Sequence, residues 1–147
     1  MDTTAVEMLR QHIGKGITAS PSPFMAWLRP VMLSVEEGSL AFQYTIRHEM
    51  TNPFGILHGG ITAAMIDDAI GATLICYGEP NYYVSVNLVV DYFASAKEGD
   101  EIIAQTAILK KGNQVVNAQC EVWNSDRTRL LAKGYTNLLK TEIKKQS

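Results

Sequence analysis

The sequence contains few of the residues that metal and redox chemistry need. There are two cysteines, Cys76 and Cys120, and three histidines, and they are scattered without the spacing of a metal site. The stretch 48–52, His-Glu-Met-Thr-Asn, begins like a zinc-protease helix but ends in asparagine, so a second histidine ligand is missing. We therefore expect no metal. Cys76 falls within an apolar stretch and is interpreted as a core thiol.

An excess of one charge is also missing. The 13 Lys and Arg and the 15 Asp and Glu give a formal net charge of −2, which argues against a nucleic-acid surface. No apolar run approaches the roughly 18 residues that span a bilayer, and the start of the chain does not resemble a signal peptide. These features predict a cytoplasmic protein with no nucleic-acid or membrane partner. P-loops, dinucleotide-binding glycine motifs and the Gly-x-Ser-x-Gly elbow are missing as well, which removes most nucleotide-binding and serine-hydrolase functions.

The 147 residues, 46% of them hydrophobic, are enough for one domain with a core, over residues 1–147. An amphipathic helix is predicted over 2–15, capped by a residue among 2–4, followed by a linker in which Pro21 and Pro23 favour extended backbone. Residues 1–22 thus precede the main fold. Alternation of apolar and polar residues predicts strands over 25–36, 39–47, 82–94, 100–110, 115–124 and 130–140, the last three joined by hairpins. The polar residues 141–147 are expected to be a frayed tail.

The most unusual stretch, residues 52–77, lies between the second and third strands. It opens as a loop rich in proline and glycine and continues from Gly60 to about Tyr77 as a helix that is apolar nearly all round. Such a helix is covered on most sides only when a strongly curved sheet wraps round it. The sequence therefore predicts an α+β fold, with a curved antiparallel β-sheet wrapped around one long central helix. Because sheet edges normally find a partner, self-association is also expected.

Two adjacent acids, Asp67 and Asp68, interrupt the apolar helix, and a buried carboxylate is costly unless it is paired or used. Asp67 could act on water as a base, or attack as a nucleophile itself. At the start of the helix, the N–H groups of Gly59 and Gly60 are expected to be unpaired and able to hold a carbonyl oxygen that gains negative charge. Two further side chains flank this spot with hydrogen-bonding capacity: Asn52 and His58.

Helix geometry separates the two candidate groups. Gly59 and Asp67 lie roughly 12 Å apart along one helix, whereas reacting atoms must approach within about 3.5 Å. If the two groups cooperate, the oxyanion donor comes from one subunit and the acid from another, across a two-fold axis.

These residues resemble a known family. Asn52, the run His58-Gly59-Gly60, Asp67 after six further residues, and the strand 84–87, Val-Ser-Val-Asn, look like the hotdog-fold acyl-CoA thioesterases of the phenylacetic-acid-degradation (PaaI) type. The resemblance covers about residues 27–139 and extends to 92–100, which is similar to the family's "pAr.GD" stretch with Lys97 where arginine is frequent. It implies a hotdog fold and an acyl-CoA thioester hydrolase that works as a homodimer or homotetramer. It also implies that the coenzyme A thioester is the substrate and that there is no metal or organic cofactor.

The resemblance implies a role for each site residue. The Gly59 N–H, supported by Asn52, would polarise the thioester carbonyl, and Gly60 would belong to the same substrate-binding loop. The partner subunit's Asp67 would activate or replace the attacking water, and Ser85 would orient that water or the acid. His58 would act near the thioester sulfur or in loop packing.

Several points stay open. Relatives often carry asparagine or another residue at the position of Asp68, so either acid could face the cleft, with Asp67 favoured by its spacing from the glycines. A hydratase or dehydratase of β-hydroxyacyl thioesters and a non-catalytic acyl-CoA-binding module are the alternative functions. The acyl group and the packing of two dimers also stay open. Surface lysines and arginines could meet the coenzyme A phosphates, although solvation explains each of them equally well: Lys97, Lys110, Lys111, Arg127 and Arg129.

Overall fold

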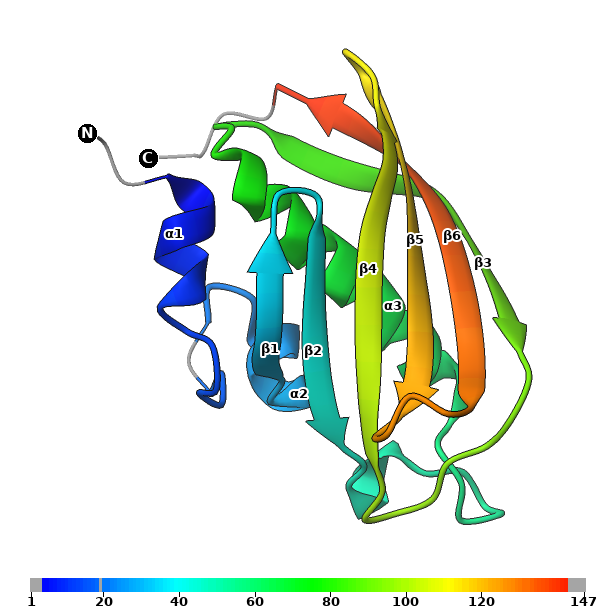
Figure 1. Ribbon diagram of the computed structural model, residues 1–147. Helices are drawn as coiled ribbons and strands as arrows, with labels where there is room; N and C mark the ends of the chain where they lie inside the picture. Colours follow the sequence, from blue (N-terminus) through cyan, green and yellow to red (C-terminus); the bar gives the residue numbers. More distant parts are fainter. Residues whose placement is uncertain (1–3, 19, 143–147) are drawn as a thin grey trace.

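A computed structural model describes residues 4–18 and 20–142 and has one antiparallel sheet curved around one long helix (Figure 1). The sheet has six strands in the order β1-β2-β4-β5-β6-β3, and helix α3 (Gly59–Leu74) lies against one face of it. The strand bounds are β1 Val31–Glu36, β2 Ser39–Thr45, β3 Tyr82–Tyr92, β4 Glu101–Lys111, β5 Val115–Asn124 and β6 Leu130–Thr141. The predicted α+β architecture is confirmed.

The last three strands pair as the short turns between them predict, β4 with β5 and β5 with β6. Strand β3 does not pair with the strand that follows it, and instead crosses to the far edge of the sheet to pair with β6. Its long connection to β4 runs past the lower end of α3 in Figure 1, so the segment after β3 reaches the loop before the helix. Strand β6 continues through Thr141, so the predicted frayed tail begins too early; residues 143–147 lie outside the described part of the chain.

The N-terminal region differs most from the prediction. Helix α1 (Ala5–Arg10) is shorter than the expected 2–15; Thr4 caps it in a capping box with Glu7, and residues 2 and 3 are not described. The strand predicted over 25–36 is wrong in its first half, because helix α2 occupies Pro23–Leu28. The Ser22 side chain caps α2 and Pro23 stands in its first turn, where a proline of fixed φ favours a helix. Two single turns complete the helices: η1 (His48–Met50) and η2 (Ile75–Tyr77).

The core forms where α3 packs on the inner face of the sheet. Gly134 in β6 allows a close approach, because a Cβ built there would lie 2.7 Å from the Cγ2 of Ile66 on the helix. Both cysteines are buried, and Cys76 accepts a hydrogen bond from the Gly38 N–H, as expected of a core thiol. By length and hydropathy alone, Gly59–Tyr77 would suffice to span a membrane, contrary to the sequence expectation. Half of its most apolar window is buried inside the protein, as in a core helix.

A β-bulge in β3 changes which residues face the helix. The register with β6 shifts between Ser85 and Asn87, so Val86 is the extra residue. Ser85 is opposite the buried Leu138, and thus faces inward together with Tyr92, while Asn87 faces outward. Strict alternation along 84–92 would put Ser85 on the opposite face from Tyr92, so the bulge brings both side chains to α3.

The two edges of the sheet are protected differently. The free edge of β1 is bonded by the N-terminal segment, where Gly14 N–H donates to the Met32 carbonyl and Ile17 N–H to that of Pro30. The free edge of β3 has no such cover from the described residues, and apolar side chains along it are exposed: Val84 42%, Val86 64% and Val89 54%. An open apolar edge of this length is the kind of strand that pairs with another chain.

Candidate active site

Asp67 lies on the one stripe of α3 that the sheet leaves exposed, together with Gly60 and Gly71. The Ser85 hydroxyl donates a hydrogen bond of 2.6 Å to Asp67 Oδ1. A bond this short to a carboxylate is charge-assisted and fixes the orientation of the group. The second oxygen, Oδ2, accepts no hydrogen bond from the described residues and is left for water or substrate. The structure thus brings together two of the predicted site residues, on helix and strand.

Asp68 points the other way, into the protein. Its Oδ2 is buried, and neither that oxygen nor the hydroxyl of the fully buried Tyr44 has a hydrogen-bond partner among the described residues. Burial, followed by the negative charge of Asp67, raises the pKa of Asp68 from its usual 3.8 to about 6. Of the two acids, Asp67 is therefore the accessible one.

The loop before α3 is held together by Asn52. Its side-chain Oδ1 accepts hydrogen bonds from the N–H groups of Phe54 (2.9 Å) and Ile56 (3.3 Å), and its own N–H donates to the Ile56 carbonyl. These bonds form an Asx-type turn that commits the side-chain oxygen to the loop. The side-chain amide donors of Asn52 have no partner among the described residues and remain available beside Gly59.

His58 is the N-cap of α3, and its role in the loop is now defined. Its Nδ1 accepts a hydrogen bond of 2.8 Å from the Gly60 N–H, which requires the neutral ring with its proton on Nε2. The expectation that both glycine amides are unpaired is therefore wrong for Gly60, whose N–H is satisfied by the cap. The Gly59 N–H has no hydrogen-bond partner within residues 4–18 and 20–142. It is the backbone donor left for an oxyanion at this helix start, beside the side-chain amide of Asn52.

Tyr92 is a site residue that the sequence prediction missed. Its hydroxyl donates a hydrogen bond of 2.6 Å to the Gly59 carbonyl, and partial burial raises its pKa, so the donor stays protonated. Together with Asn52 and Gly59 it lines a cavity of about 310 Å³, near the lower limit of ligand pockets. The other walls are mainly small or apolar: Ile56, Leu57, Thr62, Ala94, Ser95, Ala96, Val122, Leu131 and Ala132.

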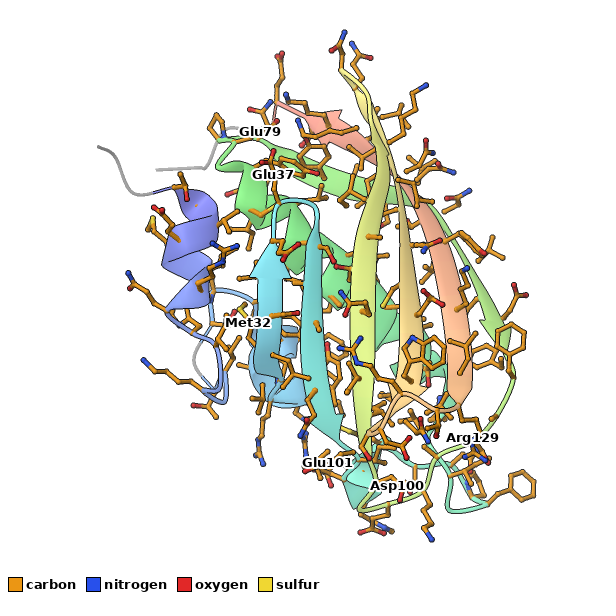
Figure 2. The ribbon with its side chains drawn as sticks, viewed as in Figure 1. Met32, Glu37, Glu79, Asp100, Glu101 and Arg129 are labelled. Carbon is orange, nitrogen blue, oxygen red and sulfur yellow. The ribbon has the colours of Figure 1, made fainter. Side chains whose placement is uncertain are left out.

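The segment after β3 clamps this cavity. The Leu57 N–H donates to the Ala96 carbonyl at 2.8 Å, which joins the loop before α3 to the segment 93–97. Arg129, labelled at the lower end of the molecule in Figure 2, donates from Nη2 to the Ser95 carbonyl at 3.0 Å. Asp100 and Glu101, labelled near it, line a second and smaller cavity of about 240 Å³ on the other side of Ala96. The loop before α3 is thus tied to the segment 93–97 by a backbone bond, and that segment is held in turn by the Arg129 side chain.

Within one chain, the site residues therefore form two separate groups. Asp67 and Ser85 make one, and Gly59, Asn52 and Tyr92 make the other around the cavity. Both groups lie on or against α3. Gly59 and Asp67, which represent them on the helix, are about two turns apart along its axis, or roughly 12 Å.

Comparison with known proteins decides the family. The family model described as the thioesterase superfamily matches residues 54–131, which include the loop, α3, β3 and β5. The chain belongs to the thioesterase superfamily. Acyl-coenzyme A thioesterase 13 of Homo sapiens is 27% identical over 132 residues, which cover 90% of this chain and 94% of that protein. The Mus musculus protein of the same name is 31% identical over 103 residues, covering 70% of this chain and 74% of that one.

Solved structures agree with this membership. The crystal structure of thioesterase superfamily member 2 from Mus musculus aligns with a TM-score of 0.79 at 27% identity, covering 94% of this chain and 98% of that one. The E. coli PaaI protein from the phenylacetic acid degradation operon has the same fold, with a TM-score of 0.75 at 19% identity over 82% of this chain and 86% of that one. The predicted hotdog thioesterase fold is confirmed, and the chain is a thioester hydrolase.

Thioester hydrolysis needs a nucleophile or base and a donor for the developing oxyanion. Asp67 is a group of the first kind, a nucleophile or base, and the Gly59 N–H is a hydrogen-bond donor of the second kind. Among the described residues, no group of three histidine, cysteine or acidic side chains could hold a metal ion.

Proposed function

We propose that this thioesterase hydrolyses acyl-CoA thioesters to free coenzyme A and a carboxylic acid, with water as the only co-substrate. The relatives named acyl-coenzyme A thioesterase 13 support this substrate class. The single observation that carries the proposal is the exposed Asp67 carboxylate, held by Ser85 with one oxygen free. Among the described residues, Asp67 has no hydrogen-bonding or ionic partner other than Ser85, which orients it.

The proposed site is shared between two copies of the chain. The Asp67 carboxylate and the Gly59 N–H of one chain are too far apart along α3 to act on one carbonyl, which requires contacts of about 3 Å. The exposed stripe of α3 and the open edge of β3 lie next to each other, because the Ser85–Asp67 bond joins them. Two chains that pair through their β3 edges under a two-fold axis bring the exposed stripe of each to the loop of the other.

The reaction then follows from the named atoms. Water attacks the thioester carbonyl carbon while the partner subunit's Asp67 takes its proton, and the Gly59 N–H binds the oxyanion. Collapse of the tetrahedral intermediate breaks the C–S bond, and the proton passes to the departing thiolate. If Asp67 attacks directly, an anhydride forms first, and water then cleaves it to regenerate the same carboxylate.

The cavity beside Gly59 is the proposed acyl site. At about 310 Å³ it is far too small for the nucleotide end of coenzyme A, whereas a compact acyl group fits. Its mainly small and apolar walls favour uncharged acyl groups, with the pantetheine arm leaving toward solvent.

Hydration of an unsaturated thioester is less well supported. Such hydratases typically pair a histidine with the acid. Here His58 uses Nδ1 for the Gly60 N–H. His48 lies 3.3 Å from Glu98, but both of these side chains are exposed and neither lines the cavity beside Gly59. The acid Asp67 is bonded by a serine instead.

The test is thiol release from a panel of acyl-CoA esters by wild type, Asp67→Asn and Asp68→Asn. The two variants remove the same charge from adjacent residues of one helix, so each controls for the other. We expect Asp67→Asn to lower kcat by at least 100-fold with its melting temperature retained, because the lost group acts in the transition state. We expect Asp68→Asn to keep near-wild-type turnover. An active Asp67→Asn enzyme, or a wild type that hydrates crotonyl-CoA without releasing thiol, would contradict the proposal.

A further inference from the structure

Tyr92 joins the edge strand to the first residue of the central helix. It is the last residue of β3 and pairs with the buried Ala132 on the inner face of the sheet. Its hydroxyl donates to the Gly59 carbonyl at 2.6 Å, and a Cβ built on Gly59 would lie 3.4 Å from the ring. The hydroxyl therefore bonds Gly59 itself, the residue whose N–H is the proposed oxyanion donor, through the carbonyl of the next peptide unit.

We infer that Tyr92 is a positioning residue for hydrolysis: it fixes the start of α3, so that the Gly59 N–H stays directed at the thioester oxygen. This inference rests on the function proposed above. Tyr92 does not touch the reacting atoms and acts through Gly59.

The helix start needs such a restraint. Gly59 and Gly60 are consecutive glycines in a first turn, where backbone freedom is greatest. Within the described part of the chain, the peptide unit of the Gly59 N–H is bonded only on its carbonyl side, where His58 O accepts from the Ile61 and Thr62 N–H groups. The His58 cap bonds the Gly60 N–H, and Tyr92 bonds the Gly59 carbonyl of the same peptide unit, so the two side chains hold that unit from both ends. An oxyanion donor loses most of its value if it moves by a fraction of an ångström to 1 Å, so a bond that holds Gly59 bears directly on turnover.

The position of Tyr92 also depends on the bulge in β3. Ser85 and Tyr92 are seven residues apart, an odd separation that would place them on opposite faces of a regular strand. The extra residue Val86 returns both to the helix side, and each then makes a 2.6 Å bond to α3, Ser85 to Asp67 and Tyr92 to Gly59. One edge strand thus orients both groups of the proposed site.

The variant that tests this inference is Tyr92→Phe, with Tyr83→Phe as its matched control. Tyr83 lies near the other end of β3, and its hydroxyl donates to Glu79 at 3.0 Å. Glu79 is labelled at the upper end of the molecule in Figure 2, opposite Arg129. Both variants lose one hydroxyl and one hydrogen bond from the same strand and keep the aromatic ring.

We expect Tyr92→Phe to lower kcat on the order of 10-fold for every acyl-CoA tested while KM changes less than about twofold, since the ring still lines the cavity. Tyr83→Phe should leave both constants at wild-type values. In a Gly59→Pro background, which lacks the donor, Tyr92→Phe should cause no further loss, because two changes that act through one group are not additive.

A second readout is independent of turnover. The NMR order parameter of the Gly59 amide should fall in Tyr92→Phe, toward the values of flexible backbone, and stay unchanged in Tyr83→Phe. Wild-type kcat in Tyr92→Phe, an effect on KM that depends on the acyl group, or an additive loss with Gly59→Pro would overturn the inference while leaving the proposed function standing. A wild-type enzyme that releases no thiol would instead remove the proposed function, and the inference with it.

Discussion

Replacement of Gly59 by proline removes the proposed oxyanion donor, with the ring Cδ in place of the hydrogen, and is compatible with the local backbone conformation. Gly59 is the first residue of α3, where proline is well tolerated because the helix does not use that N–H. The preceding residue, His58, has φ −63° and ψ 131°, the extended conformation that a residue before proline prefers. The matched control is Gly59→Ala, which adds a Cβ at the same place but keeps the N–H. That Cβ would lie 3.4 Å from the Tyr92 ring, an ordinary contact.

The magnitude follows from the loss of one backbone donor. Removing one oxyanion donor typically lowers kcat by about 100- to 1000-fold, or roughly 3–4 kcal/mol. We expect a loss of this size for Gly59→Pro, and a change of less than about 10-fold for Gly59→Ala. Both variants should unfold within about 1 kcal/mol of wild type, since neither breaks a helix bond.

Thiol-release kinetics and thermal unfolding of the three proteins measure these effects. Equal turnover in the proline and alanine variants would refute the role of the N–H. An alanine variant as inactive as the proline variant would show that the added carbon, and not the missing proton, is responsible.

Three further outcomes follow from the structure. The folded protein holds a proton on Asp68 that the unfolded chain releases, so stability is lost as pH rises from about 4 to about 6. This shift corresponds to about 3 kcal/mol, which screening at the partly exposed site reduces to about 1–2 kcal/mol. In urea unfolding, Asp68→Asn should therefore be more stable than wild type at pH 7 and as stable as wild type at pH 4. If the two proteins gave identical unfolding curves at both pH values, burial of the Asp68 carboxyl would be contradicted. Gly134→Ala should lower the free energy of unfolding by about 1–3 kcal/mol, because its Cβ would meet Ile66 at 2.7 Å. A melting temperature equal to that of wild type would mean that α3 can shift away from the sheet at no cost. Ala94→Leu, which fills part of the proposed acyl cavity, should shift the kcat/KM preference toward smaller acyl groups, and an unchanged preference would place the acyl group elsewhere.

Local sequence signals predicted most of the sheet and the central helix. The alternation in 100–140 and the polar turns specified β4, β5 and β6, and the apolar run after Gly60 specified α3. The strand predicted at 25–28 failed because Met25, Trp27 and Leu28 suit a strand or a buried helix face equally. The helix start at Ser22-Pro23 was the signal that separated them.

The site was predictable in its residues but not in its bonds. The bulge at Val86 leaves no mark on periodicity, since valines continue through it, and only the pairing with β6 shows that Ser85 faces Asp67. The Gly60 N–H is not free because it donates to His58, and this bond depends on the rotamer and tautomer of that side chain, which cannot be read from the neighbouring sequence. Tyr92 was predicted as a strand residue, and its bond to Gly59 arises from the crossing of β3 to the far edge of the sheet.

The most direct test of a shared site is complementation between two inactive chains. Gly59→Pro and Asp67→Asn chains carrying different affinity tags are co-expressed, and dimers containing one of each are purified through both tags. In such a dimer one site has the intact Gly59 of one chain and the intact Asp67 of the other, while the second site lacks both. If each site is shared between two chains, the mixed dimer has one intact site and about half the wild-type turnover per dimer. Turnover no higher than the mean of the two inactive homodimers would contradict it.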